Sequence, residues 1–248
     1  MKKAFLIGIN GKMGKMLCSC ASEYGFEISG GFDMAASNDD IPVFDDATKV
    51  NVPIDVIIDF SRPSTSILSA IEYLAKKHSA PAVIATTGFC DADIARINKL
   101  SETVPVFRSG NMSIGVAALK AAAIAVKQIL GDGFDIEIVE KHHNQKADSP
   151  SGTALLLADA LSDRNDQIVN RTGKREHGQL GIASVRGGTV VGEHEIGFYG
   201  NDEIITLAHS ARSRKLFAAG AFKAAEFLLS ASPALYDMDD LTERLNKQ

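Results

Sequence analysis

The stretch AFLIGINGKMG (residues 4–14) decides the fold of this chain. It opens with a short uncharged apolar run, which is typical of a strand covered on both faces. Gly8, Gly11 and Gly14 then precede a helical pattern. Glycines in such a turn let the backbone approach a pyrophosphate, and the N–H groups of the helix start favour an anion. The stretch therefore predicts a strand, a glycine loop and a helix that bind a dinucleotide through residues 8–14 (Gly8, Ile9, Asn10, Gly11, Lys12, Met13 and Gly14).

The glycine spacing differs by one place from the common G-x-G-x-x-G pattern, so a glycine-rich turn in a fold without a nucleotide remains the alternative. The position of Asp33 favours a dinucleotide site over this alternative, because Asp33 lies 19 residues past Gly14 at the end of the second apolar run. A carboxylate there accepts hydrogen bonds from a ribose and repels a 2′-phosphate. Residues 34–40 contain no Arg or Lys. We therefore expect NADH rather than NADPH. Lys12 in the glycine loop is a nearby cation that could neutralise a 2′-phosphate, so the use of both cofactors stays open.

The same alternation continues through the first half of the chain. Strand-like runs occupy residues 4–9, 27–33, 55–61, 81–88 and 104–110, and helical patterns occupy residues 12–24, 63–78 and 91–102. Apolar strands that alternate with helices predict right-handed crossovers. The fold class expected is therefore α/β, a Rossmann-type doubly wound parallel sheet.

The pattern changes after the long apolar helix within residues 109–130. Strand-like segments at 134–143, 181–200 and 203–211 then follow with glycine pairs at the expected turns, and only one clear helix, 150–162, interrupts them. We expect a second α+β domain with an open mixed or antiparallel sheet, over residues 114–213, for substrate binding and oligomerisation. Residues 1–113 and 214–248 would form the dinucleotide-binding domain.

Composition narrows the function further. A net charge of −5 argues against binding to nucleic acid, because such proteins usually carry a basic face. The apolar run in MKKAFLIGING is too short for a signal peptide, and no run of uncharged apolar residues is long enough to span a membrane. Cys18, Cys20 and Cys90 lack the spacing of a zinc site. A cytoplasmic protein with no membrane partner and no metal is expected.

Two loops are expected beside the glycine loop. Thr86–Gly88 follow the fourth strand and Ser109–Met112 follow the fifth. Open α/β sheets bind ligands outside the carboxyl ends of their strands, and small or amide side chains there suit a nicotinamide riboside. Each loop alone is equally well explained as a plain turn.

The stretch EKHHNQKADSPSGTA (residues 140–154) combines cationic groups with a helix start. Ser149 is expected to cap the helix with Pro150 at its first position, which leaves the N–H groups of Ser151, Gly152 and Thr153 for a carboxylate.

Upstream of this helix start, His142, His143 and Lys146 can donate protons. A solvated polar loop is the alternative. Adjacent histidines point to opposite sides of an extended chain, which disfavours a zinc site.

The same stretch resembles the signature of the dihydrodipicolinate reductase family, E-x-H-H-x-x-K-x-D-x-P-S-G-T-A, at every fixed position. The resemblance extends to GINGKMG, DVIIDFSRP, IATTGF, SGNMSIGV, VRGGTVVGEHEIGF and FAAGA. It implies NAD(P)H-dependent reduction of a cyclic dicarboxylate in the lysine and diaminopimelate pathway, by a homotetramer.

Carried over by this resemblance, His142 is the catalytic proton donor and acceptor and Lys146 the second proton donor. His143, Gly152 and Thr153 hold the substrate's carboxylates. The cofactor contacts are residues 8–13, Asp33, Ala85, Thr86, Thr87, Ser109, Gly110, Asn111 and Met112. Ala85 and Met112 depart from the usual Gly and Phe, which puts the detail of these cofactor contacts in doubt.

Other readings remain at this point. They are a different two-domain dehydrogenase of amino-acid metabolism and a regulator that senses the dinucleotide without turnover. The roles of Asp148, Arg212 and Arg214 are open. Oxidation of NADH with the product of dihydrodipicolinate synthase would distinguish the three enzymatic and regulatory readings.

Overall fold

The computed structural model describes every residue except 37–39 and 248. The chain divides into two compact units. The first contains residues 1–113 and 214–248, and the second contains residues 114–213. Each unit has a sheet and a hydrophobic core of its own.

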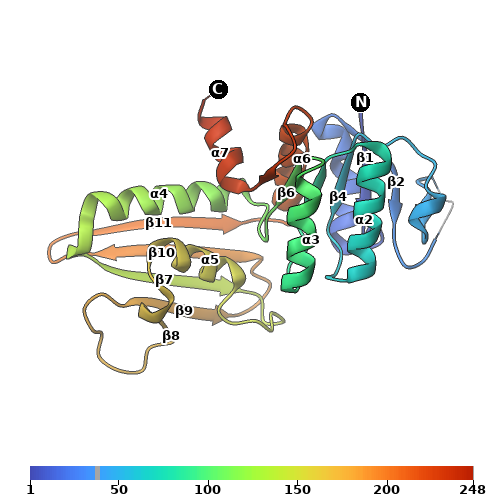
Figure 1. Cartoon of the computed structure of the whole chain (residues 1–248). Coiled ribbons are helices and arrows are strands. Elements are labelled where there is room, and N and C mark those ends of the chain that lie inside the picture. The colour runs from blue at the N-terminus through green and yellow to red at the C-terminus, as the bar shows by residue number, and fades with distance from the viewer. Residues whose placement is uncertain (37–39, 248) are drawn as a thin grey trace. The chain divides into compact units, whose positions relative to one another are not determined.

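A seven-stranded sheet forms the centre of the first unit (Figure 1). The strand order is β12-β6-β5-β4-β1-β2-β3, and every neighbouring pair is parallel. The strands span Lys2–Ile7 (β1), Phe26–Phe32 (β2), Val43–Phe44 (β3), Val56–Asp59 (β4), Ala82–Ile84 (β5), Val106–Arg108 (β6) and Leu235–Tyr236 (β12). The chain reverses its direction of winding between β1 and β4, which confirms the predicted doubly wound sheet. Strands β3 and β12 were not predicted because two residues carry no periodic pattern.

Helices cover both faces of this sheet. They span Lys12–Cys20 (α1), Thr65–His78 (α2), Asp91–Ser101 (α3), Lys215–Leu228 (α6) and Met238–Asn246 (α7). α2 packs beside α3 (Figure 1). α1 packs beside α6. The helix predicted over residues 12–24 is α-helical only to Cys20, because a 3-10 turn over Ala21–Tyr24 follows and Gly25 ends it at φ 77°. Glycine adopts that left-handed backbone without strain.

Alternate residues of the strands enter two cores. Phe5 and Ile57 pack in one cluster with Leu68 of α2, and all three side chains are fully buried. On the other face, the ring of Phe26 stacks on Phe222 of α6 with centroids 5.1 Å apart. Burial on both faces explains why the runs Ala4–Ile7 and Val56–Ile58 are apolar throughout instead of alternating.

The second unit contains a five-stranded mixed sheet (Figure 1). Its order is β11-β10-β7-β9-β8; β10 is antiparallel to β7 and β11, while β9 is parallel to β7 and β8. The strands span Asp135–His142 (β7), Gln167–Val169 (β8), Leu180–Arg186 (β9), Gly192–Tyr199 (β10) and Ile204–Ala211 (β11), and the helices span Ile114–Leu130 (α4) and Gly152–Leu161 (α5). The mixed sheet confirms the expectation for this half of the chain, while the short strand β8 was not predicted.

One face of the mixed sheet is covered by α4 and α5. Ile138 of β7 and Ile196 of β10 pack in one cluster with Leu119 of α4 and Leu157 of α5. Even-numbered residues of β7 are buried while the others are half-buried or exposed. Because side chains alternate along a strand, Glu140 and His142 continue the buried series at the carboxyl end of β7. The position of His142 is therefore fixed by the core.

Helix α4 and the turn after it, residues 114–133, are long and apolar enough to cross a membrane by length and composition alone. The core helix of a globular protein passes the same test. α4 contacts α5 and β11, and its Leu119 and Ala123 belong to the core of the second unit. Four of its apolar residues, Val116, Ala117, Leu119 and Ala123, are buried in this fold.

Candidate active site

Glycines shape the loop between β1 and α1. Gly8 has a φ of 79°, and its carbonyl accepts the N–H of Gly11 at 3.0 Å. A side chain at Gly14 would overlap the backbone carbonyls of Gly8 and Ile9. α1 begins at Lys12 without a side-chain cap. The loop therefore brings the start of a helix close to the sheet, and its N-cap, Gly11, has no side chain that could occupy the first N–H groups. A pyrophosphate site requires such an arrangement.

Asp33 lies directly after β2 and is held to this loop. Its carboxylate accepts the N–H of Asn10 at 2.9 Å on Oδ2 and the N–H of Met34 at 2.8 Å on Oδ1. A carboxylate oxygen can accept more than one hydrogen bond, so both oxygens can also accept from a ribose hydroxyl. Of residues 34–40, which bear on the cofactor preference, residues 37–39 lie outside the described part of the chain.

The end of β4 carries a polar group that the sequence analysis did not select. Asp59 is fully buried, and its Oδ1 accepts the N–H of Ser61 at 3.0 Å and the hydroxyl of Ser61 at 2.5 Å. Burial raises the pKa of Asp59. The same N–H of Ser61 lies 3.0 Å from Thr86 Oγ1. The hydroxyl of Thr86 thus joins two strand-end loops, and Thr86 is buried rather than facing outward.

The loops after β5 and β6 also meet. A Cβ on Gly110 would lie 3.1 Å from Cγ2 of Thr87. Ser109 donates its hydroxyl to the carbonyl of Asn111 at 2.8 Å, which closes the second loop. Met112 is buried, with 1% of its surface exposed. Together with the glycine loop and Asp33, these loops place every predicted cofactor residue at one edge of the first sheet.

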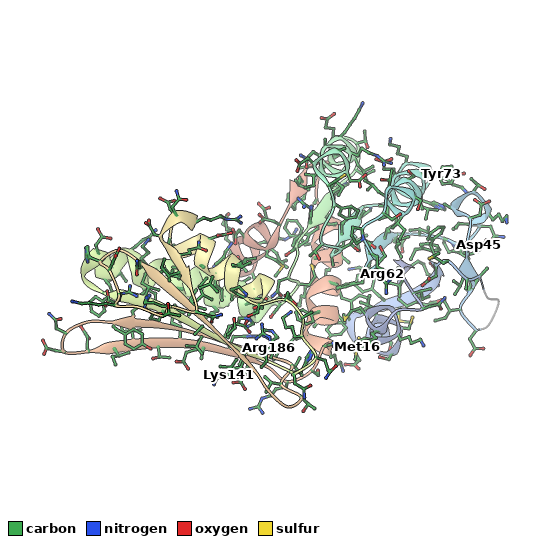
Figure 2. The ribbon with its side chains drawn as sticks, turned by 90° about the horizontal axis from the view of Figure 1, so that it is seen from below. Met16, Asp45, Arg62, Tyr73, Lys141 and Arg186 are labelled. Carbon is green, nitrogen blue, oxygen red and sulfur yellow. The ribbon has the colours of Figure 1, made fainter. Side chains whose placement is uncertain are left out.

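A buried charge cluster lies at the carboxyl end of β7. Glu140 is 0% exposed, and its Oε2 lies 2.5 Å from His142 Nδ1. Arg186, labelled in Figure 2, comes from the neighbouring strand β9 and binds the carboxylate with both terminal nitrogens, Nη2 to Oε1 at 2.7 Å and Nη1 to Oε2 at 2.9 Å. The N–H of Ser151 donates to Oε1 at 3.1 Å. Glu140 is therefore bound by three residues inside the second unit.

These contacts decide the ionisation of the cluster. Burial acts to raise the pKa of Glu140, but the hydrogen bonds from Arg186 and its other partners outweigh burial and lower the pKa to about 2. An ionised carboxylate only accepts hydrogen bonds, so the proton of the Glu140–His142 contact belongs to Nδ1 of His142. Burial lowers the pKa of His142, which the charge of Glu140 opposes. A neutral His142 at neutral pH follows.

A second histidine packs against this cluster. His194 of β10 is buried, with its ring centroid 5.2 Å from that of His142. Its Nε2 lies 3.0 Å from the hydroxyl of Ser151. Burial lowers the pKa of His194 to about 4, so it is uncharged at neutral pH. His194 was not selected from the sequence because a lone histidine within a strand carries no motif.

Lys146 lies in the turn that follows β7. Its backbone N–H donates to the carbonyl of His143 at 3.1 Å, and its Nζ lies 2.8 Å from Oδ1 of Asp148. The carbonyl of Asp148 accepts from Arg186 Nη2 at 2.7 Å. Asp148 therefore orients the ammonium group of Lys146 and ties the turn to the buried cluster, which gives it the structural role that the sequence left open.

The start of the following helix differs from the expectation. α5 begins at Gly152, and its N-cap is Ser151, whose hydroxyl accepts the N–H of Ala154 at 3.1 Å. The expectation that Ser149 is the cap and Pro150 the first helical residue is wrong, because both residues precede the N-cap. The N–H of Ser151 is also not available to a ligand, since Glu140 accepts it. Gly152, which is exposed, remains at the helix start beside Thr153.

Cys18, Cys20 and Cys90 make none of the contacts described above. The three cysteines are free. Among the described residues, no group of three or more His, Cys, Asp or Glu side chains could hold a metal ion. Arg212 follows β11 in the second unit, and Arg214 is the N-cap of α6 in the first.

Comparisons with known proteins cover almost the whole chain. The family models described as "Dihydrodipicolinate reductase, N-terminus" and "Dihydrodipicolinate reductase, C-terminus" match residues 2–112 and 115–242. A 4-hydroxy-tetrahydrodipicolinate reductase from Clostridium botulinum is 44% identical over 97% of this chain and 98% of its own length. One from Caldanaerobacter subterraneus is 42% identical over 98% of this chain and 99% of its own length.

Solved structures agree at the level of the fold. A dipicolinate-bound dihydrodipicolinate reductase from Paenisporosarcina has a TM-score of 0.78 at 23% identity, covering 96% of this chain and 97% of its own. A myo-inositol dehydrogenase from Corynebacterium glutamicum has a TM-score of 0.59 at 14% identity, covering 99% and 94%. Two matching halves, and relatives above 40% identity over 98% and 99% of their length, confirm the resemblance seen in residues 140–154. This chain belongs to the dihydrodipicolinate reductase family.

Proposed function

We propose that this enzyme is a 4-hydroxy-tetrahydrodipicolinate reductase, which reduces the cyclic dicarboxylate to tetrahydrodipicolinate with NADH or NADPH in diaminopimelate and lysine biosynthesis. The observation that supports this most directly is the cluster of His142, Glu140 and Arg186, followed by the Lys146 turn and the α5 start. Relatives that carry this name support the substrate. A cytoplasmic location is proposed with it.

The glycine loop fits a nicotinamide dinucleotide. The close approach of backbone at Gly14 leaves no room for a side chain, and α1 has no side-chain cap. In our proposal the loop N–H groups bind the pyrophosphate, Asp33 accepts from the adenosine ribose, and the backbones of Ala85–Thr87 and Ser109–Met112 hold the nicotinamide riboside. When bound, the reduced nicotinamide supplies a hydride to the substrate ring.

The groups of the second unit then supply the proton and bind the substrate. The reduced ring becomes electron-rich and takes up one proton, which the ammonium group of Lys146 can donate. His142 is the other candidate donor of this proton, through Nε2. The negative charges of a bound dicarboxylate favour the protonated form of its ring. His143 and the N-terminal turn of α5 at Gly152 and Thr153 bind the carboxylates. Together these steps add one hydride and one proton, a two-electron reduction. The 4-hydroxyl group leaves with a ring hydrogen as water, which balances the conversion of the 4-hydroxy compound to tetrahydrodipicolinate.

An assay with the product of dihydrodipicolinate synthase tests this function. The absorbance of the dihydronicotinamide should fall in proportion to the substrate supplied. A regulator would bind the dinucleotide without this turnover, and a dehydrogenase for another substrate would leave the absorbance unchanged. Either result would reject the proposed reaction.

The cofactor preference is a prediction of its own. Because Asp33 places a negative charge beside the glycine loop, a 2′-phosphate should be repelled, and kcat/KM should be higher with NADH than with NADPH. Replacing Asp33 by serine should lower kcat/KM with NADH and raise it with NADPH. The ratio of kcat/KM for NADH to kcat/KM for NADPH should therefore fall. Asp45, an exposed carboxylate elsewhere in the first unit, provides the control as Asp45→Ser. A clear preference of the unaltered enzyme for NADPH would contradict the role given to Asp33.

We also propose a homotetramer that assembles through the uncovered face of the second unit's sheet. Val185, Tyr199 and Ile204 lie on this face, opposite α4 and α5, with 48%, 38% and 61% of their surface exposed. Exposed apolar strands of this kind are typical of interfaces.

Ala208 lies on the same face, paired with Glu195 across the strands. Light scattering should give four times the mass of one chain. Ala208→Glu, which places two carboxylates side by side, should lower that mass while circular dichroism stays unchanged. A wild-type mass equal to one chain would refute the assembly.

A further inference from the structure

Glu140 has no role in the reaction as proposed above, although it binds three residues of the site. It is fully buried, and each of its oxygens accepts two hydrogen bonds. Oε1 accepts from Arg186 Nη2 and the N–H of Ser151, and Oε2 accepts from Arg186 Nη1 and His142 Nδ1. A buried carboxylate with this many donors cannot turn without losing several of them. The ring of His142 therefore faces a fixed acceptor.

The other ring nitrogen of His142 is left accessible. Among the described residues, Nε2 makes no hydrogen bond to the protein and is not one of the atoms buried without a partner. A Cβ on Gly192 would lie 3.0 Å from it, closer than ordinary contact. The glycine on β10 therefore keeps the space at Nε2 clear, while the carboxylate on β7 occupies the opposite side of the ring.

We propose that Glu140 is a positioning residue that fixes His142 as the Nδ1-protonated tautomer, so that Nε2 is the nitrogen that faces the reacting group. Arg186 is the second part of this device, because it occupies both carboxylate oxygens and holds Glu140 in place. The inference rests on the proposed role of His142 in the reduction. Beyond that role, the inference states that His142 acts through Nε2 and that Glu140 selects this nitrogen.

Four charged or titratable groups face His142, and all of them enter the test. Glu140 lies on β7, Arg186 on β9, His194 on β10, and Lys146 in the turn after β7. His194 packs edge-on against His142 and is uncharged at neutral pH. Glu140 is the one acceptor among them for the Nδ1 proton in the part of the chain that the structure describes.

Glu140→Gln changes the hydrogen-bond polarity with little change in shape. An NH2 group in place of Oε1 would face two donors, Arg186 Nη2 and the N–H of Ser151. An NH2 group in place of Oε2 would face one donor, Arg186 Nη1, and can donate to His142. The second orientation costs less, because it opposes fewer donors. The variant should therefore reverse the tautomer and leave the proton on Nε2.

The test combines 15N NMR of the full-length enzyme, labelled in its histidine rings, with steady-state kinetics. In the wild type, the neutral ring of His142 should show a protonated Nδ1 and an unprotonated Nε2. Glu140→Gln should exchange these signatures. It should also lower kcat by at least about 10-fold, as expected for a histidine in the wrong tautomer, with KM for the dinucleotide changed less than about 2-fold.

Glu137→Gln is the matched control. Glu137 lies on the same strand and is also bound by two arginines, Arg171 and Arg175, but its side chain is on the opposite face of β7 from His142. The control should keep both the tautomer of His142 and kcat. An unaltered tautomer in Glu140→Gln, or a wild-type ring protonated on Nε2, would overturn the proposal even if the enzyme reduces its substrate. Failure of the reduction itself would reject the proposed function, and the tautomer would still be measured.

Gly192→Ala keeps the inference testable if Glu140→Gln does not fold. The added methyl group would meet His142 at Nε2, so kcat should fall at least about 10-fold while Nδ1 stays protonated and bound to Glu140. Gly187→Ala, whose methyl group meets no atom within 4 Å, should retain kcat. Equal activity in both glycine variants would contradict the use of Nε2.

Discussion

Replacing Lys146 by alanine is expected to lower kcat for the reduction by about 10² to 10⁴, the usual contribution of a positioned general acid. The structure supports this choice because the ammonium group is held by Asp148, with Nζ 2.8 Å from Oδ1, in the turn directly after His142. His142→Ala should have an effect of similar size. KM for NADH should change little in both variants, because neither residue belongs to the unit that carries the glycine loop.

Lys141→Ala is the control for this experiment. Lys141, labelled in Figure 2, lies on the same strand as His142 but is exposed and paired with Glu193, 3.4 Å away. Its kcat should equal that of the wild type. Stopped-flow measurement of a single turnover separates proton and hydride transfer from product release. Near-normal single-turnover rates in both Lys146→Ala and His142→Ala would reject the assignment of these residues as proton donors.

The first unit was predictable because its signals are local. Both strand cores, Ala4–Ile7 and Val56–Ile58, are apolar because both of their faces are covered, and this pattern lies in consecutive residues. The glycine at position 14, where a Cβ would overlap the backbone, is a local signal too. The mixed sheet was predictable as a class but not as an order. The parallel pairing of β7 with β9 joins residues more than 40 positions apart, with His142 opposite Arg186. No pattern within one segment encodes such a pairing.

The candidate site follows the same rule. His142 and Lys146 lie in one short stretch and were selected together, whereas Arg186 and His194 reach them only through the order of the strands. The helix start was misplaced because Ser149-Pro150 satisfies the usual cap pattern equally well. Ser151 is the cap instead, since its hydroxyl meets Ala154 while Glu140 holds its N–H. A buried acceptor from another strand thus decided between two local alternatives.

Arg186→Ala is expected to destabilise the protein by about 3–5 kcal/mol at neutral pH, which is the usual cost of leaving a buried charge without its partner. Glu140 is 0% exposed and would lose both guanidinium hydrogen bonds, of 2.7 and 2.9 Å. The free energy of unfolding, measured in urea, reports the loss directly. Arg164→Ala is the matched control, because Arg164 also binds a carboxylate with two nitrogens, that of Asp159, but lies at the surface. The free energy of unfolding should fall much less in Arg164→Ala than in Arg186→Ala.

The pH dependence of this loss identifies Glu140 as its cause. In the wild type the pKa of Glu140 is about 2, below its ordinary value of 4.5. Its ionised form therefore stabilises the fold above pH 4.5, and that stability is lost as the pH falls toward 2. Without the hydrogen bonds from Arg186, burial raises the pKa of Glu140. The variant therefore gains less free energy of unfolding than the wild type as the pH rises and Glu140 ionises. The difference in unfolding free energy between wild type and Arg186→Ala should consequently be larger at pH 7.5 than at pH 4.5. A difference that does not change between the two pH values would show that the arginine stabilises the fold by packing and not by its charge on Glu140.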